Sequence, residues 1–308
     1  MPLLPVLPRR LQPELMDQPG LDPHRHRQAL AGLRRVNFWS GRRAPRLPIA
    51  AARGAPASPG GTGMADLVIR VGSRTDQGIR PNNEDRFVAD RERNLYLVAD
   101  GMGGQEAGEM ASGLAAEIIP RVVQDRLAHQ EDPRDAVQQA LAEANAAIVH
   151  AGRNQPAGRR MGTTAVVAVR QADKFYVAGL GDSRAYLIRR GKVEQLTVDH
   201  SVATALELNG TLTAEQARNS PWQHVLYRFL GCAEMSEGAE VRPFIPEAGD
   251  RLLLASDGLT NHVSPDDLRA EAEQFADPQA WADHLVQTAL SRGSRDNVTC
   301  IVVAFDKE

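Results

Sequence analysis

The chain has 308 residues, of which 42% are hydrophobic, with a net charge of −3 and 2 cysteines. This length suits one large or two small domains, with a core that needs no disulfide or metal to fold. The lone Cys232 and Cys300 argue against a disulfide framework or a cysteine zinc site and suit a reducing compartment, so we expect a cytoplasmic protein. No run approaches the roughly 18 to 20 apolar residues of a membrane-spanning helix.

Charge is divided unevenly along the chain. Residues 1–63 contain 10 Arg, no Lys and 3 acidic residues, whereas the remainder contains 26 basic and 36 acidic residues. The first segment also holds 10 Pro and 7 Gly, a share above the roughly 25% typical of disorder. We interpret residues 1–63 as a disordered tail, or as an extension upstream of a true start at Met64. An Arg-rich transit peptide is the remaining alternative, since an apolar signal-peptide region is missing.

Residues 64–308 have the pattern of a folded domain. Short apolar or alternating runs predict strands at 67–71, 94–99, 163–169, 174–178, 184–188, 193–196, 251–255 and 298–305. Helical spacing and helix-start signals predict helices at 109–127, 133–151, within 201–219, at 265–275 and at 278–291. The turn at 189–192 predicts a hairpin. Strands and helices come in separate runs, which favours an α+β fold.

Acidic residues recur at predicted strand ends or beside turns. They occur in Asn83-Glu84-Asp85, Asp100-Gly101-Met102-Gly103-Gly104, Gly181-Asp182-Ser183-Arg184, Ser256-Asp257-Gly258 and Arg295-Asp296-Asn297. The clearest form is an apolar strand followed by Asp and Gly, where Gly lets the backbone turn sharply or approach an ion closely. A single Asp-Gly pair is usually just a turn. Five such sites in one domain make convergence of the carboxylates the competing hypothesis.

Converging carboxylates would require a counter-ion. Like charges a few ångströms apart repel, so a cation must bind or some groups must stay protonated. Hard oxygen ligands favour Mg²⁺ or Mn²⁺ over Zn²⁺. The predicted site is therefore one for hard divalent cations.

These motifs, read in chain order, carry a resemblance. They are Arg80-(x)3-Glu84-Asp85, Val98-Ala99-Asp100-Gly101-Met102-Gly103-Gly104 with Ala107-Gly108-Glu109, Met161-Gly162-Thr163-Thr164, Gly181-Asp182-Ser183-Arg184, Leu196-Thr197-Val198-Asp199-His200-Ser201, Ser256-Asp257-Gly258-Leu259-Thr260 and Arg295-Asp296-Asn297-Val298-Thr299. Together they resemble the metal-dependent Ser/Thr protein phosphatase family (PPM, type 2C-like) in its bacterial form. The resemblance extends over residues 67–305.

The resemblance implies a four-layer αββα sandwich, in which two antiparallel sheets are flanked by helices, with a flap at residues 199–231. It implies two Mn²⁺ or Mg²⁺ ions and a weaker third. The two ions would be bound by Asp85, Asp100, the Gly101 carbonyl, Asp257 and Asp296. Glu84 would hold metal-bound water, Asp182 would help to bind the third ion, and Arg80 would clamp the substrate phosphate.

The implied activity is hydrolysis of phosphoserine and phosphothreonine in proteins by a water that bridges two metals, which opposes a Ser/Thr kinase. Two metals can lower the pKa of water, orient it and neutralise the phosphate, and the planar guanidinium of Arg suits phosphate. We expect a monomer that acts on phosphoproteins and binds no nucleic acid. The alternatives are a sporulation-type phosphatase acting on an anti-sigma-factor antagonist and a catalytically weak phosphoprotein-binding module. Arg80 and the flap argue against the first alternative, and the intact Asp85, Asp100, Asp257 and Asp296 argue against the second.

Two positions depart from the family pattern. Animal members carry a His after the Asp-Gly pair, thought to act as general acid, where this chain has Met102, which cannot donate a proton. Many members carry an Asp where this chain has Asn261, so we expect a weaker third metal site, unless the neighbouring His262 substitutes.

Overall fold

The computed structural model describes residues 67–104, 106–153, 161–232 and 238–308. The predicted tail lies outside these residues. The described chain forms two compact units, one of residues 67–199 and 228–308 and the other of residues 200–227. The smaller unit falls within the segment that the sequence assigns to a flap.

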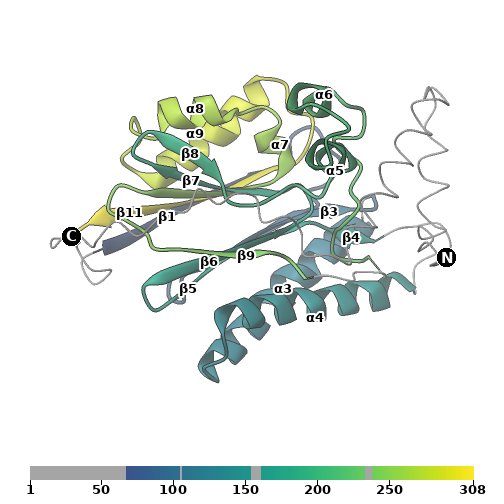
Figure 1. Ribbon diagram of the computed structural model, residues 1–308, viewed down its shortest axis with the longest axis horizontal. Coiled ribbons are helices and arrows are strands. Elements are labelled where there is room, and N and C mark those ends of the chain that lie inside the picture. The colour runs from purple at the N-terminus through teal and green to yellow at the C-terminus, as the bar shows by residue number, and fades with distance from the viewer. Residues whose placement is uncertain (1–66, 105, 154–160, 233–237) are drawn as a thin grey trace. The chain divides into compact units, whose positions relative to one another are not determined.

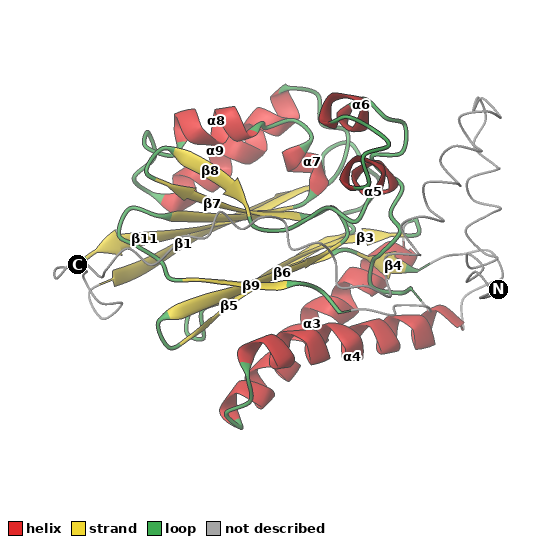
Figure 2. Ribbon diagram, viewed as in Figure 1, coloured by secondary structure: helices red, strands yellow, loops and turns green. Residues whose placement is uncertain are grey.

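Two antiparallel sheets build the larger unit (Figures 1 and 2). The first has the order β1 (Leu67–Asp76), β11 (Val298–Lys307), β10 (Arg251–Ala255), β7 (Arg184–Arg189) and β8 (Lys192–Gln195). The second has the order β2 (Asp85–Asp90), β3 (Leu95–Met102), β5 (Ala165–Gln171), β6 (Lys174–Leu180) and β9 (Val241–Phe244), and the short β4 (Gly162–Thr163) also pairs with β3.

Helices cover the outer face of each sheet (Figure 2). The long helices α3 (Glu106–Ala128) and α4 (Pro133–Arg153) pack on the second sheet, and α8 (Pro265–Glu271) and α9 (Pro278–Ser291) pack on the first. A third apolar cluster lies between the sheets. The layers are thus helix, sheet, sheet and helix, which confirms the predicted α+β sandwich. In the part of the chain that the structure describes, every helix is too short or too polar to span a bilayer.

Strand β11 illustrates why the sheets lie in the interior. Cys300 and Val302 face the helices, whereas Ile301 and Val303 face the other sheet. Successive strand residues point to opposite faces. A strand covered on both faces must therefore be apolar at nearly every position, and the apolar run at 300–305 reflects this. Thr299 is a polar exception near the start of the strand, and its hydroxyl is hydrogen-bonded to Thr75 Oγ1 at 2.7 Å.

Most predicted elements are confirmed, including the β7–β8 hairpin, in which Arg189 pairs with Lys192. The sequence analysis missed β2, β4, β9 and the one-turn helix α7 (Asp257–Thr260). β2 and β9 are short and only partly apolar, so their patterns are weak. β3 also continues past Asp100, because Gly101 and Met102 pair with β4. The prediction that Asp100 follows the end of its strand was therefore wrong.

The unit of residues 200–227 contains α5 (Val202–Leu208) and α6 (Ala214–Arg218), with Ser201 and Thr213 as N-caps. Its own apolar cluster is centred on Leu206 and Trp222. The ends of the unit meet, since the backbone N–H of Tyr227 donates to the carbonyl of His200 at 2.9 Å. The segment thus closes on itself as a small helical unit.

Candidate metal centre

Strand pairing brings the predicted acidic residues to one end of the two sheets. Asp85 opens β2 directly opposite Asp100 in β3. Asp182 lies in the turn that leads from β6 in the second sheet to β7 in the first. Asp257 follows β10, and Asp296 lies two residues before β11. Asp85, Asp182, Asp257 and Asp296 all act electrostatically on Asp100, so the convergence predicted from the sequence is present.

The pKa values of both members of the inner pair, Asp85 and Asp100, are raised. Burial is the main cause that raises the pKa of Asp85 to about 7, and hydroxyl hydrogen bonds from Thr299 and Ser256 oppose the shift. Burial, followed by the charge of Asp85, raises the pKa of Asp100 well above its usual range. Carboxylates in this environment gain from a bound cation, because it removes both repulsion and desolvation cost.

Asp85 has one satisfied and one unsatisfied oxygen. Its side chain is 3% exposed, and its Oδ2 accepts a hydrogen bond from Ser256 Oγ at 2.9 Å. Its Oδ1 is buried and has no hydrogen-bond partner among the described residues. A buried acceptor without a partner costs roughly 1 to 3 kcal/mol. An oxygen-preferring cation at Oδ1 would remove this cost, so the residues present fit a hard divalent metal ion.

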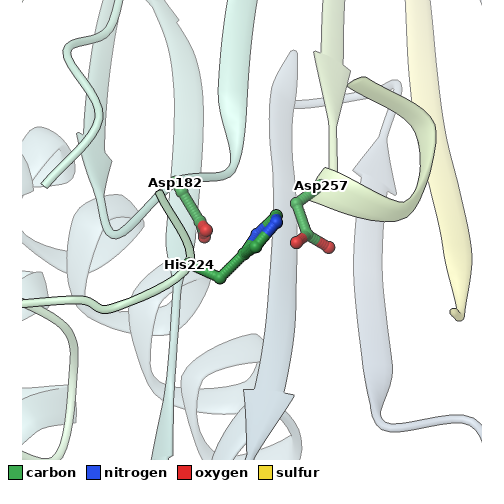
Figure 3. Close-up of side chains that lie close together, drawn as sticks. All are labelled: Asp182, His224 and Asp257. Atoms are coloured by element: carbon green, nitrogen blue, oxygen red, sulfur yellow. The ribbon is translucent and has the colours of Figure 1, made fainter. Parts of the chain in front are cut away.

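A second pair of carboxylates, the outer pair, comprises Asp182 and Asp257. Each offers an oxygen within 4.8 Å of the other, and Figure 3 shows them extending from the β6–β7 turn and the start of α7. Burial, followed by the charge of Asp257, raises the pKa of Asp182 to about 7. Asn261 Nδ2 donates to Asp257 Oδ2 at 3.2 Å. Asn261 therefore supplies a neutral donor where many family members would supply a further carboxylate.

The backbone around Glu84 is held from three sides. Its N–H donates to Asn297 Oδ1 at 2.8 Å, and its carbonyl accepts from the Gly101 N–H at 3.2 Å and from Ser112 Oγ at 2.5 Å. A Cβ placed at Gly108 would lie 1.8 Å from Glu84 Oε2. Because Gly108 in α3 has no side chain, it leaves the space that the Glu84 side chain occupies.

Arg80 lies on the loop between β1 and β2. Its Nη2 is 2.6 Å from Asp296 Oδ2, and its side chain is 51% exposed. Asn297 holds the same loop, because its Nδ2 donates to the carbonyls of Gln77 at 2.9 Å and Asn82 at 3.0 Å. The structure therefore places a solvent-accessible guanidinium at the edge of the carboxylate cluster.

The glycine of the Asp-Gly motif at Asp257 is needed for close packing against the backbone. Gly258 does not have a positive φ, but a Cβ there would lie 2.0 Å from the carbonyl oxygen of Asn297. The glycine lets the start of α7 approach the loop before β11, and this packing brings Asp257 and Asp296 together. The close approach seen here is to the backbone of Asn297.

Sequence reasoning did not assign roles to several buried polar residues that support the cluster. Thr164 Oγ1 accepts from the Asp100 N–H at 2.9 Å and shares a 2.7 Å hydrogen bond with Ser183 Oγ, next to Asp182. Ser256 Oγ donates to Asp85 Oδ2, and Asn297 Oδ1 accepts from the Glu84 N–H. The available signal was the position of Ser183, Ser256 and Asn297 inside the acidic motifs, where a polar residue lies close to an apolar strand.

A two-sheet sandwich with carboxylates gathered at one end offers a site for hard divalent cations, which a metal-dependent hydrolase requires. The sequence matches the family model of protein phosphatase 2C over residues 70–209. It is 34% identical over 240 residues to serine/threonine phosphatase stp of Listeria monocytogenes, covering 76% of this chain and 94% of that protein. It is 36% identical over 241 residues to serine/threonine protein phosphatase PstP of Mycobacterium tuberculosis, covering 77% of this chain and 45% of that protein.

Solved structures agree with this relationship. The crystal structure of the M. tuberculosis phosphatase PstP/Ppp has a TM-score of 0.69 and 33% identity, covering 78% of this chain and all (100%) of that one. The PstP catalytic domain in complex with two manganese ions has a TM-score of 0.68 and 33% identity over the same shares. This chain belongs to the protein phosphatase 2C family. It is a metal-dependent serine/threonine protein phosphatase that uses Mn²⁺ or Mg²⁺.

Proposed function

We propose that Asp85, Asp100, Asp257, Asp296 and the Gly101 carbonyl hold two divalent cations, and that the chain thereby hydrolyses phosphoserine and phosphothreonine in proteins. The observation that carries this assignment is the buried Oδ1 of Asp85, which lacks a partner among the described residues and lies beside other carboxylates. In addition, the donor set consists of oxygens, which suits Mn²⁺ and Mg²⁺.

When bound, the two cations would lower the pKa of a water molecule and neutralise charge on the phosphate. Glu84 would orient water by accepting a hydrogen bond. Its backbone is fixed to Asn297, Gly101 and Ser112, so its carboxylate would be held in one place. Such preorganisation lowers the cost of aligning the attacking group.

Arg80 would bind the substrate phosphate. Its guanidinium pairs with Asp296 and remains half exposed, so it can exchange one anionic partner for another without being desolvated. Its planar N–H groups can donate two parallel hydrogen bonds to phosphate oxygens. Arg80 is thus assigned to ground-state binding of the phosphate.

Met102 cannot supply the proton that the leaving group needs. Met102 continues β3 and pairs with Gly162, and a thioether carries no proton to donate. In our proposal solvent protonates the departing serine or threonine oxygen.

Asp182, together with Asp257, would form a weaker third metal site, because Asn261 brings an amide to Asp257 rather than a carboxylate. The flap would influence substrate choice. We further propose that the enzyme is a cytoplasmic monomer that opposes a Ser/Thr kinase by acting on that kinase and its substrates.

The test is a phosphopeptide assay of the purified protein with Mn²⁺ and with EDTA. We expect phosphate release from phosphoserine and phosphothreonine peptides with Mn²⁺ only, and loss of turnover in Asp257→Asn and Asp296→Asn proteins that fold normally. Turnover in EDTA, or near-normal turnover of either variant, would contradict the ligand assignment.

A further inference from the structure

Ser256 occupies a position between the two sheets that the proposed reaction does not explain. It follows β10 of the first sheet, is 0% exposed, and donates through Oγ to Oδ2 of Asp85 on β2 of the second sheet at 2.9 Å. It also directly precedes Asp257. One hydroxyl therefore connects residues assigned to metal binding on both sheets.

The direction of this hydrogen bond is fixed by the surroundings of Ser256. A serine hydroxyl has one proton to donate and lone pairs to accept. The Thr299 N–H donates to Ser256 Oγ at 3.1 Å, which uses its acceptor side. The other possible acceptor of its proton, the Thr299 carbonyl, is 3.5 Å away. The proton therefore goes to Asp85, whose Oδ2 is 2.9 Å away.

We propose that Ser256 is a positioning residue for the metal centre. By holding Oδ2 of Asp85, it turns Oδ1, which has no partner among the described residues, toward the cation, and it locks β2 to the start of α7. This inference rests on the proposed role of Asp85 as a metal ligand. Hydrogen bonds to a metal-binding carboxylate orient it, and their removal typically costs about 10- to 100-fold in metal affinity.

The alternative is that Ser256 only satisfies the backbone of β11 inside the sheet. Its backbone N–H donates to the Thr299 carbonyl at 3.0 Å, a bond that an alanine would keep. A purely structural role predicts loss of stability in Ser256→Ala without a specific loss of metal affinity. The two roles thus differ in metal binding rather than in turnover.

The experiment measures Mn²⁺ binding to the full chain by isothermal titration calorimetry, with circular dichroism to confirm folding. We expect Ser256→Ala to bind one Mn²⁺ at least about 10-fold more weakly than wild type. Ser294→Ala is the matched control, because Ser294 is also buried and donates to the Gly258 carbonyl at 2.9 Å, without a carboxylate partner. We expect its Mn²⁺ affinity to stay within about twofold of wild type.

Asp85→Asn separates this inference from the proposed function. If Asp85→Asn binds two Mn²⁺ as wild type does, the ligand assignment fails, and with it the role of Ser256. If Asp85→Asn loses a Mn²⁺ but Ser256→Ala binds normally, only the role of Ser256 is overturned. Equal losses in Ser256→Ala and Ser294→Ala would also overturn it, because general loosening would then suffice.

A double variant tests whether Ser256 acts through Asp85. Adding Ser256→Ala to Asp85→Asn should change the remaining Mn²⁺ affinity by less than about twofold, since the oriented carboxylate is already gone. A further large loss would contradict the proposal. If Ser256→Ala does not fold, Ser256→Cys keeps the volume but donates weakly. We then expect weaker Mn²⁺ binding, and wild-type affinity would overturn the proposal.

Discussion

The inner pair, Asp85 and Asp100, and the outer pair, Asp182 and Asp257, are built in different ways. The two residues of the inner pair lie opposite each other on neighbouring strands β2 and β3. Asp85 accepts a hydrogen bond from Ser256, and the backbone N–H of Asp100 donates one to the hydroxyl of Thr164. The outer pair extends from a turn and from a one-turn helix, and the side chain that donates to Asp257, Asn261, is neutral. Rigid strands and directed hydrogen bonds position ligands more precisely than turns do.

The difference suggests a division of labour within one cluster. A pair fixed by the sheets can hold cations in a constant geometry, as catalysis requires. A pair at the edge can bind a further cation loosely. We therefore expect substitutions at the inner pair to abolish turnover, as at Asp257, which in our proposal also binds the two catalytic cations. Substitution of Asp182, which serves only the outer site, should tune turnover.

The largest expected effect is the difference in kcat between Asp100→Asn and Asp182→Asn. Loss of the inner ligand should lower Mn²⁺-dependent kcat at least about 1,000-fold, equivalent to about 4 kcal/mol of transition-state stabilisation. Loss of Asp182 should lower it by no more than about 10-fold, or about 1.4 kcal/mol. Steady-state kinetics on a phosphopeptide with saturating Mn²⁺ provide the comparison. Equal losses of kcat in the two variants would contradict the different roles of the inner and outer pairs.

Arg80→Ala probes the phosphate side of the cluster. A charge-assisted hydrogen bond contributes about 1.5 to 3 kcal/mol, so we expect KM for phosphopeptides to rise about 10- to 100-fold with a smaller change in kcat. Arg93→Ala is a matched control, because Arg93 also pairs with an aspartate, Asp90, at 3.0 Å but lies at the opposite end of β2 and β3. An unchanged KM in Arg80→Ala would exclude the phosphate-binding role.

The raised carboxylate pKa values predict how metal stabilisation depends on pH. Asp85 and Asp182 have pKa values of about 7 in the metal-free fold, against about 3.9 in an unfolded chain. The folded state therefore binds more protons than the unfolded state between about pH 4 and 7, and these groups lower stability as pH rises through that range.

Because Mn²⁺ binds the deprotonated carboxylates, its stabilising effect should grow in the same direction. The difference in Tm between protein with Mn²⁺ and protein with EDTA should be larger at pH 7.5 than at pH 5.5. Differential scanning calorimetry measures both values. A difference that shrinks with rising pH would contradict the carboxylate cluster as the metal site.

The smallest expected effect concerns Asn261→Asp, which converts the outer site to the form that many relatives carry. We expect the weakest Mn²⁺ binding step to tighten by about 3- to 10-fold, or about 0.7 to 1.4 kcal/mol, because a carboxylate attracts the cation more strongly than an amide does. Asn261→Ala removes the hydrogen bond to Asp257 without adding charge and should not tighten binding. Calorimetric titration of both variants tests whether the missing negative charge at residue 261 limits the Mn²⁺ affinity of the outer site.

Sequence patterns alone predicted an α+β fold and recurring acidic residues, and the family resemblance implied the sandwich and the candidate ligands. Neither predicted the side chains that support those ligands. The largely apolar run 298–305 predicted a strand, and the resemblance carried by the acidic motifs proposed Asp85, Asp100, Asp257 and Asp296 as metal ligands. The role of Ser256 could not be predicted, because its contact with Asp85 spans 171 positions of the chain. Such contacts depend on how two sheets stack, which local patterns do not encode.

The most direct test of the account is anomalous X-ray diffraction from crystals of the full chain grown with Mn²⁺. We predict two strong manganese peaks roughly 3.5 to 4 Å apart, coordinated by Asp85, Asp100, Asp257 and Asp296, with Oδ1 of Asp85 as the ligand atom and Oδ2 still bound to Ser256. Manganese peaks remote from these carboxylates, or Asp85 oriented away from the metal ions, would contradict it.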